Sequence, residues 1–158
     1  KPSKNEWVMT QEYGKTFKVY RQDLSMAATF QAVKATAGYP TVRLELAPMS
    51  GNNASWENKW GINISFKELH AVASVLTGLK KVCSGSFHSE GKNHSYEFSN
   101  TGIGVKLVIH FAGHGRSITL NGNDAFWLST LVIDAIAQNA PPGFANNLIM
   151  PLIQRTQF

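Results

Sequence analysis

The sequence predicts an α+β fold with two antiparallel four-stranded sheets and two helices, built from a strand–strand–strand–strand–helix unit that occurs twice. Short runs of alternating apolar and polar residues cover most of the chain, which is typical of half-buried strands. Two such runs pass directly into a helical pattern, near Ser65 and near Asn121. The 158 residues are enough for one sizeable core. We therefore expect a single domain over residues 1–158, with halves at about 14–80 and 81–140 and a docking tail at 141–158.

Four strands are predicted in the first half, at residues 15–21, 29–35, 42–46 and 60–65. In the first of them Lys18 and Tyr20 share one face, opposite Phe17 and Val19. The second is weaker, because its alanines suit a helix equally well. The third alternates, so Arg43 faces away from the apolar side of the strand. The loop between the third and fourth strands is polar but carries a tryptophan, Trp56.

A helix is predicted directly after the fourth strand. Ser65 is followed three residues later by Glu68, the spacing of a capping box. Leu69, Val72, Ala73 and Leu76 then recur at helical spacing, and Gly78 is a suitable end for the helix.

Four strands are also predicted in the second half, at residues 82–89, 95–100, 105–112 and 116–120. Asn121 is a candidate N-cap for the helix that follows, and Asp124 lies in its first turn, where its charge suits the helix dipole. Residues 126–137 are almost entirely apolar, which indicates a helix buried against a sheet and against another subunit. The tail is also expected to dock, because it carries several large apolar residues, namely Leu148, Ile149, Met150, Leu152 and Ile153.

The charge balance points toward a polyanionic partner. Lys and Arg number 15 against 10 Asp and Glu, a formal net charge of +5 in a chain with only 16% charged residues. Such an excess favours nucleic acid as a partner, although ordinary solubility charge explains net charge equally well. No run of about 18 apolar residues is present, so no membrane partner is expected. Cys83, the single cysteine, fits a reducing intracellular compartment.

Catalytic and metal-binding patterns are weak. His110 and His114 are four residues apart, but this spacing aligns two ligands only in a helix, and here it falls on a strand and a turn. Cys83 close to Lys81 suggests a lowered thiol pKa, yet a lone strand cysteine is more often a small core residue. We therefore expect no enzyme activity, no metal and no cofactor.

The remaining signal is a set of basic and aromatic side chains on the predicted strands. Lys and Arg along strands neutralise successive phosphates, and aromatic rings among them stack on unpaired bases. Because a duplex hides its base faces, this combination favours single strands. Taken singly, each lysine has an alternative reading as a solvated face, and each aromatic residue as core. The candidate nucleic-acid-binding residues are Lys15, Lys18, Tyr20, Arg21, Lys34, Arg43, Lys59, Trp60, Lys92, Tyr96, Lys106 and Arg116.

The twofold strand and helix order, with its two strand-to-helix junctions, resembles the Whirly family of single-stranded-DNA-binding proteins. It is similar as well to the related mitochondrial guide-RNA-binding proteins and the positive transcription cofactor of RNA polymerase II. Gly14 and Lys15 match the Lys-Gly-Lys-containing first strand of Whirly proteins, whereas the residues that follow differ. The resemblance covers roughly residues 14–140.

The resemblance implies two sheets packed roughly perpendicular and held by the two helices. It also implies subunits that assemble through those helices, often as tetramers, with single-stranded nucleic acid lying across sheet edges and between neighbouring sheets. Family functions range over transcription, recombination, repair and guide-RNA annealing.

Three functional hypotheses follow. The leading one is a non-enzymatic protein that binds single-stranded nucleic acid with little sequence preference, DNA favoured over RNA, as a dimer or tetramer in replication, recombination, repair or transcription. The alternative is a protein–protein interaction or structural assembly module that uses the same sheets, with Trp56 and Trp60 as protein contacts. A small hydrolase using Cys83 or the histidines ranks third.

Overall fold

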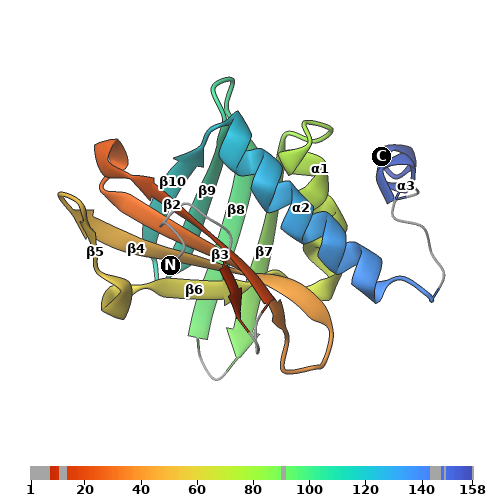
Figure 1. The fold of residues 1–158 in the computed structure, drawn as a ribbon, viewed down its shortest axis with the longest axis horizontal. Coiled ribbons are helices and arrows are strands. Elements are labelled where there is room, and N and C mark those ends of the chain that lie inside the picture. The colour runs from red at the N-terminus through yellow and green to blue at the C-terminus, as the bar shows by residue number, and fades with distance from the viewer. Residues whose placement is uncertain (1–7, 11–13, 90–91, 143–146, 148, 158) are drawn as a thin grey trace.

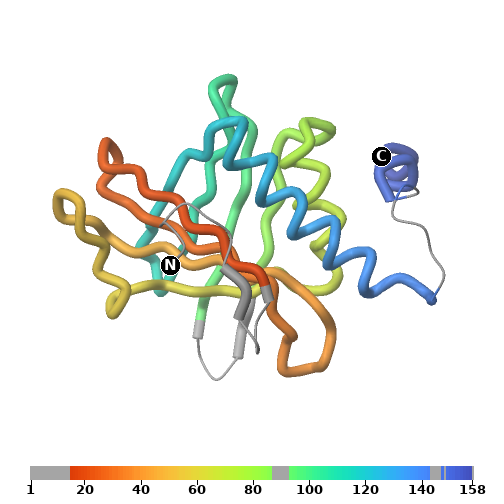
Figure 2. Tube along the Cα trace, in the orientation of Figure 1, coloured from red at the N-terminus to blue at the C-terminus, as the bar shows by residue number. Residues whose placement is uncertain are grey.

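The computed structural model describes residues 8–10, 14–89, 92–142, 147 and 149–157, and the side chains of residues 8–10, 87–89 and 92 lie outside the described part. Two antiparallel sheets and two helices follow one another along the chain, with a third helix near the C-terminus. Figure 2 shows this path, from the first sheet in red to yellow through the second in green to cyan, and then to the blue C-terminal helices.

The first sheet contains the four predicted strands and two short additional ones. Its strands are β1 (Val8–Thr10), β2 (Gly14–Arg21), β3 (Met26–Lys34), β4 (Pro40–Ser50), β5 (Asn53–Ala54) and β6 (Trp60–Asn63). They are ordered β1-β2-β3-β4-β5, and β6 also pairs with β4. Strand β3 corresponds to the second predicted strand and begins three residues earlier than predicted. It is a full member of the sheet, so the alternative prediction of a helix from its alanines is wrong.

The second sheet is a four-stranded antiparallel meander, as predicted. It consists of β7 (Val82–Ser89), β8 (Lys92–Asn100), β9 (Val105–Phe111) and β10 (His114–Leu120), in the order β10-β9-β8-β7. Figure 1 shows the strands of the first sheet crossing those of the second at a steep angle.

The helix ends differ in how well local sequence predicts them. Helix α2 (Gly122–Asn139) is capped as predicted, with the Asn121 side chain accepting a hydrogen bond from the backbone N–H of Asp124 at 2.8 Å. The capping box predicted for the first helix is wrong, because the Ser65 side chain makes no capping hydrogen bond. A short 3-10 turn, η3 (Phe66–Glu68), comes first and leads into α1 (Leu69–Leu76). Gly78 follows α1 with a φ of +83°, a conformation that favours glycine.

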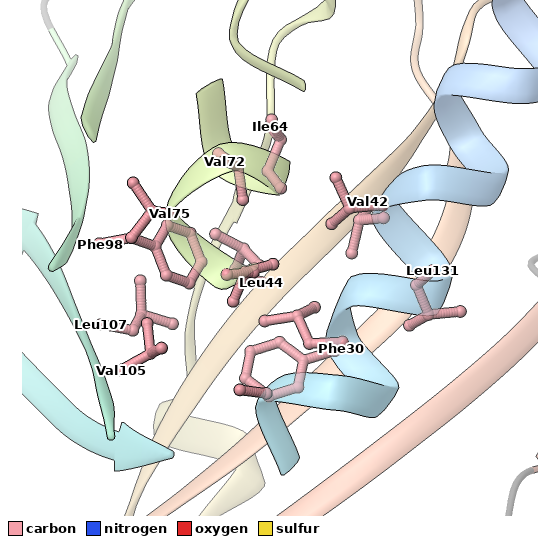
Figure 3. Close-up of a cluster of buried hydrophobic side chains, with 14 of the residues drawn as sticks. Phe30, Val42, Leu44, Ile64, Val72, Val75, Phe98, Val105, Leu107 and Leu131 are labelled. Atoms are coloured by element: carbon pink, nitrogen blue, oxygen red, sulfur yellow. The ribbon is translucent and has the colours of Figure 1, made fainter. Parts of the chain in front are cut away.

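The core lies where both sheets and both long helices meet. Figure 3 shows Phe30 and Leu44 of the first sheet close to Val75 of α1 and to Phe98 and Leu107 of the second sheet. All five side chains are fully buried. The inward alternation predicted for β9 is confirmed, with Val105, Leu107 and Ile109 buried and Lys106 and His110 exposed.

Helix α2 and the tail bury only part of their apolar surface. One face of α2, including Leu128, Leu131 and Val132, is buried, whereas Phe126 on the other side is 58% exposed. Helix α3 (Ile149–Arg155) buries Ile149 and Ile153, and the Gln157 amide donates a hydrogen bond to Ser74 of α1 at 2.9 Å. Within the described ranges, every helix is too short or too polar to cross a membrane.

Candidate nucleic-acid interface

Basic and aromatic side chains gather on the face of the first sheet that points away from the helices. The strand register places Lys18, Thr29, Glu45 and Gly61 in one row across β2, β3, β4 and β6. The next row carries Arg43 on β4 beside Asn63 on β6. Paired residues in a sheet share a face, so residues far apart in the sequence converge here. We call the set Lys18, Tyr20, Arg43, Trp56 and Lys59 the basic-aromatic face.

Glu45 orders two of the cations on this face. One carboxylate oxygen, Oε2, lies 3.0 Å from Arg43 Nε and 3.3 Å from Lys59 Nζ. The Glu45 side chain is only 10% exposed, whereas those of Arg43 and Lys59 are 36% and 46% exposed. The Glu45 carboxylate is therefore nearly buried, and the two cations that it binds are accessible to solvent. With Lys18 nearby, this face carries three positive charges against one negative charge.

Trp56 supplies the aromatic part of the face. It lies on a short 3-10 turn, η2 (Trp56–Asn58), between β5 and β6. The Lys18 amine lies 4.9 Å from its ring centroid, a cation–π distance, and the Tyr20 ring meets it edge-on with centroids 6.3 Å apart. Partial burial raises the pKa of Tyr20, so its hydroxyl stays protonated at neutral pH. Sequence reasoning assigned Trp56 only to the protein-contact alternative.

Gly61 leaves room for the Arg43 side chain. A methyl group at position 61 would lie 2.2 Å from Arg43 Nη2, so the guanidinium occupies the space directly above this glycine. Arg43 Nη1 also donates a hydrogen bond to the Asn63 side chain at 3.3 Å. The position of the Arg43 guanidinium is therefore set by Glu45, by Asn63 and by the absence of a side chain at Gly61.

Two candidates, Trp60 and Arg116, face inward and join the two sheets. Trp60 pairs with buried Leu46 and stacks on Phe111 of β9, with centroids 4.7 Å apart and planes 6° apart. The Arg116 guanidinium lies 4.0 Å from the Trp60 ring and donates hydrogen bonds to the backbone oxygens of Leu46 and Asn58. Burial lowers the pKa of Arg116. Their predicted place on an outer face is therefore wrong, and both hold the sheets together.

Two further candidates, Tyr96 and Arg21, are also engaged in contacts within the fold. Tyr96 is 2% exposed and shares the inner face of the second sheet with Phe98, so its predicted role in stacking on bases is wrong. Arg21 pairs with Asp23 at 2.7 Å and donates to the backbone oxygen of Thr119 on the other sheet. The hydrogen bond with Asp23 raises the pKa of Arg21.

The remaining candidates are spread over the surface. Lys15 and Lys34 are exposed near strand ends, and Lys106 is exposed on the outer face of the second sheet. Lys92 begins β8, and its side chain lies outside the described part of the structure. Of the twelve candidates, Lys18, Tyr20, Arg43 and Lys59 are therefore the ones that the first sheet brings together.

A cleft opens beside the basic-aromatic face, between the edge strand β6 and the second sheet. It has a volume of about 590 Å³. Arg43 and Lys59 line it together with hydroxyl and amide groups of Asn63, Ser65 and Ser86. Its other lining residues include Tyr39, Glu68, His94, Tyr96 and Phe111.

The structure gives no support to the hydrolase hypothesis. Cys83 is buried, and this burial raises the pKa of its thiol to about 11, so the thiol is a poor nucleophile at neutral pH. His94 stacks flat against Phe111, with centroids 3.6 Å apart. Within the described residues, no three His, Cys, Asp or Glu side chains are grouped so that they could hold a metal ion.

Comparisons with known proteins identify the type of fold. No family model matches the chain, and no curated protein matches it. Among solved structures, it is similar to the crystal structures of MRP1/MRP2 from Trypanosoma brucei, with a TM-score of 0.55 and 10% sequence identity. The match covers 78% of this chain and 92% of that chain. At this identity the similarity shows the fold alone, and it confirms the predicted Whirly-like arrangement of two antiparallel sheets with helices.

Proposed function

We propose that this protein binds single-stranded nucleic acid, with DNA as the expected ligand and RNA as the alternative, and that it does so without catalysis. The observation that carries the proposal is the basic-aromatic face, on which three cations and two aromatic rings lie on one exposed sheet. Arg43, Lys59 and Lys18 would contact phosphates, and Tyr20 and Trp56 would stack on unpaired bases. The sequence resemblance associates the same fold with this ligand class.

The geometry favours single strands over duplexes. Side chains on a sheet lie over a broad surface rather than on a narrow element that enters a groove. Aromatic rings contribute about 1–3 kcal/mol for each stacked base, but only where the base is unpaired. Contacts of this kind read no sequence, so we expect binding that is largely tolerant of sequence.

Fluorescence anisotropy tests the proposal directly. Labelled single-stranded DNA of about 30 nucleotides, RNA of the same sequence and a DNA duplex are titrated across a salt series. We expect tight, salt-sensitive binding to the single strands and weaker binding to the duplex. No binding at low salt, or equal binding of duplex and single strands, would contradict the proposal. The alternative function, a protein-binding module, predicts little dependence on salt.

We also propose that the chain self-associates through α2, as a dimer or tetramer. Phe126 is 58% exposed, and Ile103, in the turn between β8 and β9, is 88% exposed. Exposed apolar side chains that gather in one place often mark an interface. Phe126 lines a groove with Ala125, Ile133 and Met150. Light scattering coupled to size exclusion tests this, with Phe126→Ser expected to shift the mass toward a monomer and Lys80→Ala as the control. A monomeric wild-type protein would refute it.

A further inference from the structure

We propose that the cleft beside β6 binds one guanine base, and that Glu68 and Tyr96 recognise its Watson–Crick edge. This inference rests on the proposed function, because it adds one preferred position to an otherwise sequence-tolerant interface. The same chemistry fits a guanine in an unpaired strand or in a free nucleotide, and the strand is the expected source. The cleft opens next to Arg43 and Lys59, where phosphates of a bound strand would lie.

Two of the residues that line the cleft each carry a polar atom that is buried without a partner. Glu68 Oε2 and the Tyr96 hydroxyl make no hydrogen bond within the described part of the chain, and both residues line the cleft. Burial raises the pKa of Tyr96, and the nearby Glu68 charge raises it further, so the phenol keeps its proton. Buried polar groups are nearly always hydrogen-bonded, so an unpaired set lining a cleft indicates a place for a ligand.

The position of these atoms is fixed by the fold. Tyr96 lies on the inner face of β8 against Gly85 of β7, where a methyl group would approach the Tyr96 hydroxyl to 2.4 Å. Glu68 ends the 3-10 turn before α1, and its backbone N–H donates to the Ser65 carbonyl at 3.0 Å. The side chain that failed to form a capping box therefore lines the cleft instead.

The chemistry of the pair selects one base. A carboxylate accepts two hydrogen bonds, and a protonated phenol donates one. Guanine presents a matching edge, with O6 as an acceptor beside N1–H and the N2 amino group as donors. Adenine and cytosine each present at most one donor group on this edge, and thymine or uracil has one donor between two acceptors. Bases splayed out of a single strand are commonly read on this edge.

The size and the polar rim of the cleft fit a nucleotide. Its volume of about 590 Å³ lies within the range of roughly 300–1,000 Å³ that is typical of small-molecule sites. Ser86 and Asn63 add hydrogen-bonding groups at the sides, and Arg43 and Lys59 supply positive charge for the attached phosphate.

The first test changes the ligand, so it does not depend on the folding of a variant. Oligothymidylate of about 16 nucleotides is compared with the same strand carrying a single central guanine, adenine, inosine or 7-deazaguanine. We expect one guanine to raise the affinity about tenfold, the order of a bidentate contact to a base. Inosine, which lacks the N2 amino group, should lose most of the gain, whereas 7-deazaguanine, which keeps the Watson–Crick edge, should retain it.

The second test changes the protein. Glu68→Gln places an amide donor against the guanine donors, and Tyr96→Phe removes only the unpaired hydroxyl, a change that is neutral or stabilising for a buried group without a partner. Both variants should lose the guanine gain while their affinity for plain oligothymidylate stays unchanged. Thermal unfolding checks that each variant is folded.

The outcomes separate the two proposals. Binding of oligothymidylate with no gain from guanine, or an equal gain from adenine, overturns the guanine site and leaves single-strand binding intact. Failure to bind any strand overturns the proposed function. In that case calorimetry with guanosine 5′-monophosphate and adenosine 5′-monophosphate tests the guanine site. Binding of the guanosine nucleotide that depends on Glu68 supports the site, with a free nucleotide as the ligand. No binding of the guanosine nucleotide overturns it.

Discussion

The charge on the basic-aromatic face can be tested by removing two of its three cations. Lys18 and Lys59 are suitable targets because neither is deeply buried. Among the described residues their loss breaks one cation–π contact and one half-exposed ion pair, and Glu45 keeps Arg43 as a partner. Each of these contacts contributes about 1 kcal/mol or less to stability. The double variant Lys18→Ala/Lys59→Ala should therefore fold, with a melting temperature lowered by only a few degrees.

The expected effect on binding follows from counterion release. Each phosphate contact to a single strand contributes about −0.7 to the slope of log affinity against log salt. If Lys18, Arg43 and Lys59 each contact one phosphate, they contribute about −2.1 together, and Arg43 alone leaves about −0.7. Raising salt from about 50 to 200 mM would then weaken the contribution of the intact face roughly 18-fold but that of the double variant only about threefold.

Anisotropy titrations at several salt concentrations measure this slope, and the difference between proteins is the quantity to compare. Lys80→Ala is the matched control, because it removes an exposed lysine after α1 and should leave the slope unchanged. Lys106→Ala addresses a separate question, since a flatter slope would mean that the strand also contacts the second sheet. A double variant with the wild-type slope would refute the assignment of Lys18 and Lys59 to the interface.

Four other changes test individual contacts. Glu45→Gln removes the carboxylate beneath the cations and should strengthen binding at low salt by several-fold, measured by anisotropy. Gly61→Ala displaces the Arg43 guanidinium and should weaken binding while changing unfolding stability by less than about 1 kcal/mol, because only a flexible side chain must move. Trp60→Leu should cost about 2 kcal/mol in chemical unfolding, through lost contacts with Phe111 and Arg116, and should not alter the salt slope. Burial raises the pKa of the Cys83 thiol to about 11 in the folded protein, against about 8.5 in the unfolded chain. The thiol should therefore contribute its full stabilisation below about pH 8.5 and lose it as the pH rises to about 11. Over this range the free energy of unfolding of the wild type should fall more than that of Cys83→Ala.

Local sequence rules predicted the parts of the fold that depend on neighbouring residues. The alternation through Val105, Leu107 and Ile109 fixes one inward face, because a strand turns successive side chains to opposite sides. Asn121 acts on a backbone group three residues away, so its role is readable from the sequence. Such signals were sufficient for the two sheets and for the position of α2.

Strand alternation places Trp60 on the face of buried Ile62 and Arg116 on the face of buried Ile118, so a local signal for the inner face was present for both. Trp60 begins β6 and pairs with Leu46 of β4, and Arg116 lies in β10 and pairs with Ile109 of the neighbouring strand β9. Both residue types suit an exposed binding surface and a buried stacked contact equally well. The same holds for Tyr96, which lies two residues before buried Phe98 but was assigned to the outer face because of its polar hydroxyl.

The place of Glu45 at the centre of the basic-aromatic face shows what such a surface requires. A carboxylate there repels phosphate, so charge alone would favour a neutral residue. However, long lysine and arginine side chains lose about 0.5–1.5 kcal/mol each when a ligand immobilises them. By holding Arg43 and Lys59 before the ligand arrives, Glu45 lowers that entropic cost and fixes where the phosphates lie. If so, Glu45→Gln should strengthen binding at low salt, where attraction dominates, and lose this advantage as salt screens the charges and the disorder of the two cations remains.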